Sequence, residues 1–169
     1  MQTPHLELAK RENLSIAIAL INQAKEYLKE QGINQWQTGY PDAECIEADI
    51  ENDKGYLLIH TGKIIGYMCI DFDGEPAYET LKGEWKSKRN YAVVHRMAID
   101  SSFRGKGIAI TTFELIENLC KTKEIFSIRV DTDQANTKMQ HILKKSEFEY
   151  CGRIWFQNSE KIAFEKLID

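Results

Sequence analysis

One stretch near the middle of the chain restricts the fold more than any other, because a strand pattern passes through a glycine turn directly into a helix pattern. Residues 91–99 are typical of a strand, 100–106 of a turn, and 108–121 of a helix with apolar side chains on one side. A further strand pattern follows over 126–131. Strand, helix and strand in this order predict a β-α-β crossover, and therefore an α/β domain.

The glycine turn also predicts a binding site for an anion. The first turn of a helix has backbone N–H groups without intrahelical partners, and the helix dipole adds positive charge there. Gly105 and Gly107 remove side chains that would keep a ligand away from the backbone, while Arg104 and Lys106 add full positive charges. These features suit a phosphate or pyrophosphate. The alternative is a glycine-rich turn that only starts a helix.

Two common phosphate-binding motifs do not fit this turn. A P-loop needs G-x-x-x-x-G-K-[ST], which the sequence lacks. A dinucleotide-binding turn needs a third glycine where Ile110 stands, although Asp131 follows the next strand, roughly where a ribose-binding acid is expected. A nucleotide-dependent oxidoreductase is therefore an alternative that NAD binding would test.

The rest of the chain predicts helices and strands around this crossover. Helix patterns cover 13–31, 42–51 and 137–145, and strand patterns cover 55–60, 63–72, 148–157 and 161–166. Residues 73–90 are polar and irregular, although Tyr78, Leu81 and Trp85 suggest a short helix there. A strand near Leu6 is possible, but Leu6-Glu7-Leu8 is too short to predict one. We expect a single domain over residues 1–169, of the α/β (α+β) class with a mixed sheet.

Charge and hydropathy exclude several classes of partner. Lys and Arg number 22 against 26 Asp and Glu, giving a formal net charge of −4, so the protein has no general attraction to nucleic acid or to anionic membranes. No apolar stretch is long enough to span a bilayer. The N-terminus has no secretory pattern, so we expect a cytoplasmic protein.

The cysteines do not suggest a metal site or a disulfide framework. None forms a C-x-x-C pair or has a histidine at zinc-ligand spacing, so we expect no metal. A catalytic thiol is a more distant alternative. We expect small core residues in a reducing compartment at all four positions: Cys45, Cys69, Cys120 and Cys151.

At residues 104–109 the run Arg-Gly-Lys-Gly-Ile-Ala resembles the R/Q-x-x-G-x-G/A signature of the GNAT (Gcn5-related) N-acetyltransferases. The order of elements after residue 13 is also similar to that family. Asn136 to Gln140, with Phe148 following, resemble the family's later N-x-x-A/M segment. The remaining runs together are similar to a bacterial subgroup of the family: Trp36-Gln37, Tyr40-Pro41, His95-Arg96, Arg129 to Thr132, and Tyr150 to Gly152. The resemblance covers nearly the whole chain.

The resemblance implies a mixed, mostly antiparallel sheet with a central β-α-β crossover and helices on both faces. It also implies an N-acetyltransferase with acetyl-CoA as cosubstrate. The cofactor-binding positions carried over are Met97 and Ile99 for the pantetheine arm, Met97 or Ala98 as backbone donor to the thioester oxygen, Arg104, Gly105, Lys106, Gly107, Ile108 and Ala109 for the pyrophosphate, and Asn136 near the thioester. The run Asp131-x-Asp133-x-x-Asn136 lacks the glycine and glutamate of a calcium loop, and there we expect a helix cap at Asn136.

Catalysis of acetyl transfer to an amine needs a general base, for which we predict His95. Alternation along a strand would place His95 on the face of Met97, and Val93 stands where family members often have a glutamate. The alternative is a histidine that only packs beside the sheet. The usual acid position holds Leu143, so we predict Tyr150 as a substitute; the alternative is an ordinary half-buried sheet tyrosine.

The acceptor is predicted only as a class: a primary amine of a small molecule or a peptide. Acidic residues in the N-terminal half either attract a cationic amine or form a solvated surface: Glu44, Glu47, Asp49, Asp71, Asp73 and Glu75. Four aromatic residues either line an acceptor pocket or anchor loops: Trp36, Tyr40, Tyr78 and Trp85. A non-catalytic acyl-CoA sensor is the second hypothesis, because Val93 and Leu143 replace expected catalytic residues. A homodimer stays open, since GNAT proteins often dimerise.

Overall fold

The computed structural model describes residues 3–169. The described chain divides into two compact units, one of residues 3–70 and 96–115 (unit 1) and one of residues 71–95 and 116–169 (unit 2). Two elements, β5 (Ala92–Ile99) and α3 (Ile108–Thr122), begin in one unit and end in the other. The single domain expected over residues 1–169 stays a prediction.

Unit 1 contains an antiparallel set of strands and two helices. Its strands are β1 (His5–Leu8), β2 (Gly55–His60), nearly all of β3 (Lys63–Asp71) and the second half of β5, hydrogen-bonded in the order β1-β2-β3-β5. Its helices are α1 (Leu14–Glu30) and α2 (Ala43–Glu51), and α3 begins here. β1 was too short to predict from the sequence, yet its four residues pair with β2 from His5↔Ile59 to Leu8↔Tyr56.

The ends of the two helices follow from local sequence. Gly32 has φ +72°, and the N–H groups of Gly32 and Ile33 donate to Lys29 and Leu28 at 3.0 and 2.9 Å, which closes α1 where the glycine predicts its end. α2 starts after Asp42, whose carboxylate accepts the N–H of Cys45 at 2.9 Å. The buried faces of both helices share one core with β2, β3 and β5, formed by Ala17, Leu20, Ile21, Ile46, Ile50, Leu57, Tyr67 and Ala98.

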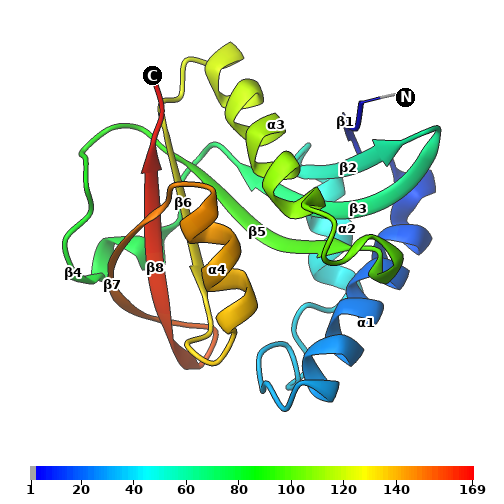
Figure 1. Ribbon diagram of the computed structural model, residues 1–169, viewed down its shortest axis with the longest axis horizontal. Coiled ribbons are helices and arrows are strands. Elements are labelled where there is room, and N and C mark those ends of the chain that lie inside the picture. The colour runs from blue at the N-terminus through cyan, green and yellow to red at the C-terminus, as the bar shows by residue number, and fades with distance from the viewer. Residues whose placement is uncertain (1–2) are drawn as a thin grey trace. The chain divides into compact units, whose positions relative to one another are not determined.

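Unit 2 contains the crossover strand and a closing hairpin. Its strands are the first half of β5, β6 (Ser127–Thr132), β8 (Ser159–Leu167), β7 (Glu149–Phe156) and β4 (Lys82–Gly83), hydrogen-bonded in that order. A short 3₁₀ helix covers Pro76–Thr80 and includes Tyr78, one of the residues that suggest a short helix in this otherwise irregular segment. α4 (Thr137–Lys145) has the predicted bounds, and Figure 1 shows it beside β6 and β8.

The pairing confirms the predicted fold class. β5 and β6 are parallel, with Ala92↔Ile128 and Val93↔Arg129 in register, and α3 connects them as the predicted crossover. The pairs β1–β2, β2–β3, β6–β8, β7–β8 and β4–β7 are antiparallel. The eight strands of the described residues therefore form a mixed, mostly antiparallel sheet, accompanied by four α-helices. Among residues 3–169, no helix combines the length and apolar character that crossing a membrane requires.

Two glycines face each other where β4 meets β7. Gly83 has φ +147° and Gly152 has φ +149°. A Cβ on Gly83 would lie 2.2 Å from the carbonyl oxygen of Cys151, and a Cβ on Gly152 would lie 2.3 Å from that of Lys82. Neither position has room for a side chain, so the two backbones meet only because both residues are glycine.

Candidate functional site

The glycine turn of unit 1 has the geometry of an anion-binding helix start. After the 3₁₀ turn Ser101–Phe103, Gly105 and Gly107 have φ +74° and +73°, and α3 begins at Ile108. The first helical bond of this segment is from the N–H of Thr111 to the Gly107 oxygen at 3.1 Å. The N–H groups of the three preceding residues therefore have no acceptor within the helix.

The space around this turn is open. A Cβ built on Gly105 or Gly107 would meet no heavy atom within 4 Å, and residues 105–107 are exposed. A ligand can thus approach the backbone N–H groups directly. The positive φ angles are strained for any residue except glycine, which explains the two glycines independently of a ligand.

Both basic residues of the turn lie against aromatic rings of the same unit. The guanidinium carbon of Arg104 is 3.5 Å from the centroid of the Tyr27 ring on α1, and Nζ of Lys106 is 5.8 Å from that of Phe103. Stacking restricts the Arg104 side chain without neutralising its charge. The turn therefore combines two cations with a helix start, as the sequence predicts.

In β5 the structure contains a left-handed residue that the sequence did not predict. Arg96 has φ +53°, a left-handed conformation inside a strand. Its Nε and Nη2 donate to the two carboxylate oxygens of Asp49 at 2.8 and 2.6 Å, and its Nη1 donates to the Tyr40 hydroxyl at 2.6 Å. Tyr67 donates its hydroxyl proton to the same carboxylate at 2.7 Å. We call these four side chains the Arg96 clamp.

The Arg96 clamp is buried and stays charged. The side chains of Arg96 and Asp49 are only 11% and 7% exposed. Burial alone lowers the pKa of the Arg96 guanidinium, but its hydrogen bonds to Asp49 outweigh burial and raise that pKa above its ordinary value. Burial and the nearby Asp49 carboxylate raise the pKa of Tyr67, which keeps its proton for the hydrogen bond. Asp49 is therefore engaged in an ion pair and is not part of a solvated acidic surface.

His95, the predicted base, lies in unit 2 within a polar and aromatic group. It is 9% exposed, and its Nε2 is 3.5 Å from Oε1 of Glu75. Its ring stacks on Phe156 with centroids 5.6 Å apart and lies 6.3 Å from the Tyr78 ring. The left-handed turn at Arg96 interrupts the extended backbone, so simple alternation does not place His95 and Met97 on one face.

A second carboxylate reaches this group through Tyr78. The Tyr78 hydroxyl donates to Oδ2 of Asp131 at 2.6 Å, and burial together with that carboxylate raises the pKa of Tyr78 well above its ordinary value. Trp85 donates its indole N–H to the Tyr78 carbonyl at 2.8 Å. The pair Tyr78 and Trp85 therefore anchors the irregular segment, as Tyr40 anchors its own loop through Arg96.

Tyr150, the predicted acid, lies in a different part of unit 2. It is 51% exposed and packs edge-on against Phe164, six residues along β7 from the Phe156 that stacks on His95. Six residues of strand span roughly 20 Å. The structure thus does not bring His95 and Tyr150 together.

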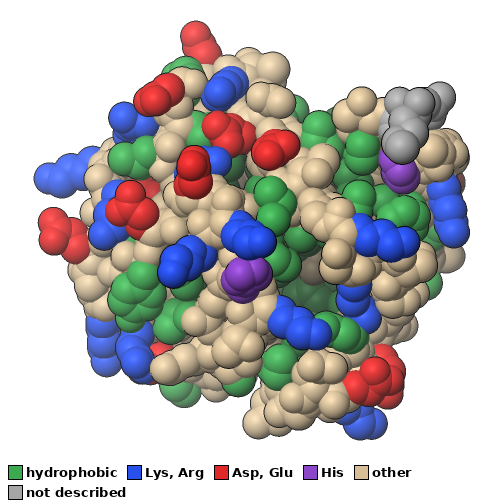
Figure 2. All heavy atoms as spheres, viewed as in Figure 1, with side chains coloured by type: hydrophobic (Ala, Val, Ile, Leu, Met, Phe, Trp, Pro, Cys, Tyr) green, Lys and Arg blue, Asp and Glu red, His purple; other side chains and the backbone are tan. Residues whose placement is uncertain are grey.

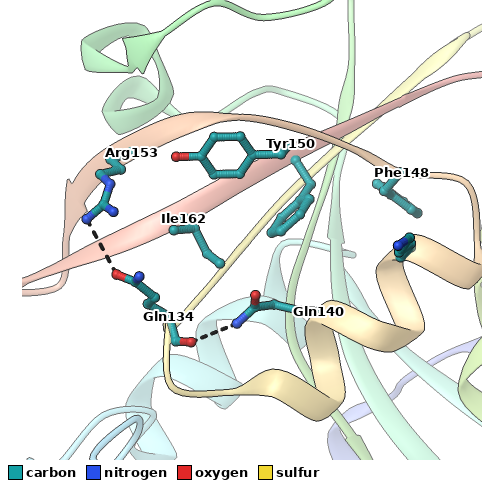
Figure 3. Close-up of a pocket in the computed structure, with 8 residues that line it drawn as sticks. Gln134, Gln140, Phe148, Tyr150, Arg153 and Ile162 are labelled. Carbon is teal, nitrogen blue, oxygen red and sulfur yellow. Dashed lines mark hydrogen bonds between the residues drawn. The ribbon is translucent and has the colours of Figure 1, made fainter.

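Tyr150 lines an open pocket of about 500 Å³ between α4 and the β7–β8 hairpin (Figure 3). Within this pocket Gln134 accepts from Gln140 at 2.7 Å and from Arg153 at 3.4 Å. α4 carries three lysines, and Figure 2 shows basic side chains gathered over this helix, beside a histidine. Positive charge on this side disfavours a cationic amine beside Tyr150.

The other predicted cofactor positions have identifiable places. Asn136 caps α4, accepting the N–H of Met139 at 3.1 Å, as predicted for a strand-end turn. Met97, Ala98 and Ile99 complete β5 in unit 1, and Ala98 is 2% exposed. Within residues 3–169, no group of three or more His, Cys, Asp or Glu side chains could hold a metal ion.

The cysteines are free thiols, and three of the four are buried. Burial raises the pKa of Cys120 to about 12 and that of Cys151 to about 11. It also raises the pKa of Cys45. Thiols with such pKa values hold their protons at neutral pH, which agrees with core residues and disfavours a catalytic thiolate.

Comparison with solved structures shows the same fold. A GNAT-family acetyltransferase from Streptococcus agalactiae is 30% identical, with 99% of this chain and 97% of that chain covered and a TM-score of 0.90. A GNAT-family acetyltransferase from Listeria monocytogenes is 20% identical, with 98% and 95% covered and a TM-score of 0.77. The aminoglycoside acetyltransferase AAC(6')-Ib, in complex with coenzyme A, is 16% identical, with 98% and 95% covered and a TM-score of 0.71.

The family itself is shown by sequence. None of the curated proteins compared with the chain is similar enough to match. The acetyltransferase (GNAT) family, however, matches residues 21–148, which include the glycine turn, the Arg96 clamp, His95 and α4. This match spans more than half of the 169 residues. Together with the likeness to the streptococcal enzyme, it establishes that this chain belongs to the GNAT acetyltransferase family.

Proposed function

We propose that the protein is an N-acetyltransferase that transfers the acetyl group of acetyl-CoA to a primary amine of a small molecule or peptide. The observation that carries this proposal is the turn at residues 104–109, with its two left-handed glycines, two cations and open helix start. A diphosphate is the group that such a turn suits. Two similar structures of AAC(6')-Ib contain coenzyme A and acetyl-CoA, which supports the same cosubstrate here.

Acetyl-CoA, when bound, supplies an activated acetyl thioester. Arg104, Lys106 and the backbone around Gly105 and Gly107 would hold its diphosphate. The backbone N–H of Met97 or Ala98 would donate to the carbonyl oxygen as it becomes negative. The thioester is thereby held next to β5, where the amine attacks it directly.

His95 would take the proton that the attacking amine loses. Its imidazole lies 3.5 Å from the Glu75 carboxylate, which stabilises the imidazolium formed by proton transfer. The new bond joins nitrogen to the acetyl carbon, and the bond from that carbon to sulfur breaks. The sulfur leaves as a thiolate; a simple thiol has a pKa of about 8.5, so this step proceeds without a general acid.

Two observations bear on the acceptor. Two carboxylates, Glu75 beside His95 and Asp131 on Tyr78, place negative charge around the proposed base and favour a cationic amine. AAC(6')-Ib has also been solved with coenzyme A and kanamycin, a complex that supports a small amine as acceptor for this fold. Tyr150 lies away from His95 and these carboxylates, and its role as general acid stays a prediction.

A second candidate function is an acyl-CoA sensor without turnover. Val93 is fully buried, and Leu143 is the buried residue of α4 with 1% of its surface exposed, so neither position that lacks its expected catalytic residue offers a substitute. The sensor would bind acetyl-CoA through the same turn.

Release of free thiol from acetyl-CoA separates the two functions. The enzyme is incubated with acetyl-CoA and a panel of primary amines, with the corresponding alcohols as matched controls, and thiol is measured by a colour reagent. We expect release with at least one amine and with none of its alcohol counterparts. Saturable acetyl-CoA binding without thiol release for any amine would instead establish the sensor.

A further inference from the structure

We propose that the Arg96 clamp is a positioning device that holds residue 96 of β5 in its left-handed conformation and thereby orients the peptide between Arg96 and Met97. This inference rests on the proposed function, in which the backbone of Met97 or Ala98 serves the thioester. Because peptide bonds are planar, the torsion angles at Arg96 set the direction of the Met97 N–H. Asp49, Tyr40 and Tyr67 would act through Arg96 and touch no substrate.

The conformation at Arg96 needs an explanation because it is strained. Among residues 3–169, eight non-glycine residues have positive φ, and the other seven lie in loops, turns or at element ends. Arg96 alone of these lies inside a strand. A left-handed arginine persists only where surrounding contacts outweigh the preference of a non-glycine residue for negative φ.

The clamp supplies such contacts from three elements of unit 1. α2 provides both oxygens of Asp49, the loop before it provides the Tyr40 hydroxyl, and β3 provides Tyr67 to hold Asp49 in place. A guanidinium that donates to both oxygens of one carboxylate has a single allowed orientation. The side chain of residue 96 is therefore fixed at its far end, which constrains the backbone to which it is attached.

Stability alone does not account for this pair. Removing two charges from water costs free energy that their attraction only balances, and apolar side chains of similar size often stabilise a fold as well. The chain contains a second buried pair, Arg129–Glu165, with side chains 7% and 0% exposed. Arg129 lies in β6 without a positive φ, so a buried ion pair in this protein does not by itself require or produce a left-handed residue.

Glycine and alanine at position 96 distinguish positioning from packing. Both substitutions remove the clamp, but glycine adopts positive φ freely and alanine does not. We expect Arg96→Gly to have a higher kcat than Arg96→Ala, which should lose roughly 10- to 100-fold through misplacement of the reacting groups. KM for acetyl-CoA should change by less than about threefold in both, because the glycine turn still holds the diphosphate.

Position 129 provides the matched control. There the backbone is extended, so Arg129→Ala should be at least as stable as Arg129→Gly, the order found in ordinary strands. Asp49→Asn removes the charge but keeps the volume, and adding Arg96→Gly to it should restore part of the lost kcat. Packing alone predicts no such recovery, because the double variant has lost more side chain than the single one.

Thermal unfolding gives a readout that needs no turnover. We expect the Tm of Arg96→Gly to exceed that of Arg96→Ala, the reverse of the order at position 129. A Tm for Arg96→Ala equal to or above that of Arg96→Gly would overturn the clamp whether or not the enzyme turns over. A wild type that acetylates an amine, with kcat no higher for Arg96→Gly than for Arg96→Ala, would overturn the positioning role alone. A wild type inactive toward every amine would refute the proposed function separately.

Discussion

Gly107 and Gly62 have nearly the same backbone but different surroundings. Their φ angles are +73° and +76°, and a Cβ on either would meet nothing within 4 Å. A side chain at either position therefore has room, and the same strain of about 1–2 kcal/mol. Gly107 precedes the start of α3, however, whereas Gly62 lies in the turn between β2 and β3. Substitutions at these two glycines therefore distinguish the backbone strain, which both share, from the loss of an anion site, which only a change at Gly107 can cause.

Replacing Gly107 by aspartate tests the glycine turn. We expect Gly107→Asp to weaken acetyl-CoA binding at least about tenfold, or about 1.4 kcal/mol, because the carboxylate fills the open space and repels the diphosphate. Gly62→Asp should lower the free energy of unfolding by about as much as Gly107→Asp does, and it should leave the affinity for acetyl-CoA unchanged. Isothermal titration calorimetry on both variants measures this, and equal affinities for the two would contradict the predicted site.

Replacing His95 tests the proposed base. We expect His95→Ala to lower kcat about 100-fold near neutral pH, where the acceptor amine is protonated and needs a base. The loss should shrink as the pH approaches about 10, the ordinary pKa of an alkyl amine, because the free amine then attacks without help. A pH profile of kcat for both proteins checks this, with KM for acetyl-CoA as the control. An unaltered profile removes His95 from the mechanism.

At the scale of elements, one buried carboxylate connects three segments of unit 2. Glu165 on β8 accepts the hydroxyl of Ser127 on β6 at 2.6 Å, and the N–H of Lys86 and hydroxyl of Ser87 at 2.6 and 2.8 Å. It also pairs with Arg129 at 3.3 Å. These bonds fix the irregular loop before β5 to the sheet.

The acid stability of unit 2 should depend on this carboxylate. Burial raises the pKa of Glu165, but the hydrogen bonds from Ser127 and Ser87 and the charge of Arg129 outweigh it and hold the pKa below the ordinary 4.5. A lowered pKa means that its stabilisation is complete above the unfolded-state pKa and is lost as the pH falls through the folded-state value. Glu165→Gln should therefore cost about 3–5 kcal/mol at pH 7, because it leaves Arg129 buried without its partner.

The difference in free energy of unfolding between wild type and Glu165→Gln should become smaller below about pH 4.5, the pKa range of a carboxyl group. Urea unfolding at several pH values, followed by circular dichroism, measures it. Glu160→Gln is the matched control: its partner Arg153 and Glu160 itself are 45% and 49% exposed, so little stability should be lost. If this difference in free energy of unfolding stays constant down to pH 3, Glu165 is not the titrating group.

Elements with a strong local pattern were predictable from sequence, and elements defined by partners were not. α4 has a cap at Asn136 and an apolar face, and its predicted bounds match the structure. α1 ends where Gly32 predicts. β1 and β4 have four and two residues, too few to show a period, and they exist because β2 and β7 offer hydrogen bonds. Such strands are set by tertiary pairing.

The candidate site divides in the same way. The glycine turn was predictable because its chemistry is contiguous in sequence. The Arg96 clamp was not, since Asp49 and Arg96 are 47 residues apart and a left-handed arginine has no sequence signature. Asp49 and Tyr40 bind Arg96, and the left-handed Arg96 interrupts the strand alternation around His95.

At the scale of the whole molecule, ligand binding should raise the temperature of unfolding. Acetyl-CoA at about 100 times its Kd should stabilise the folded protein by about 2.7 kcal/mol. For a chain of this length that corresponds to a rise in Tm of about 5–10 °C. NAD at the same concentration should produce no rise. A thermal shift with NAD and none with acetyl-CoA would favour an oxidoreductase over an acetyltransferase.

The facing glycines of β4 and β7 have a consequence for natural variation. A Cβ on Gly83 or on Gly152 would lie within 2.3 Å of the opposite carbonyl oxygen. Neither glycine can therefore be replaced by another residue on its own. We expect orthologues either to keep both glycines or to have changed both positions together. A lineage that loses either glycine should also have remodelled residues 81–86, so that the β4 edge no longer approaches its neighbour.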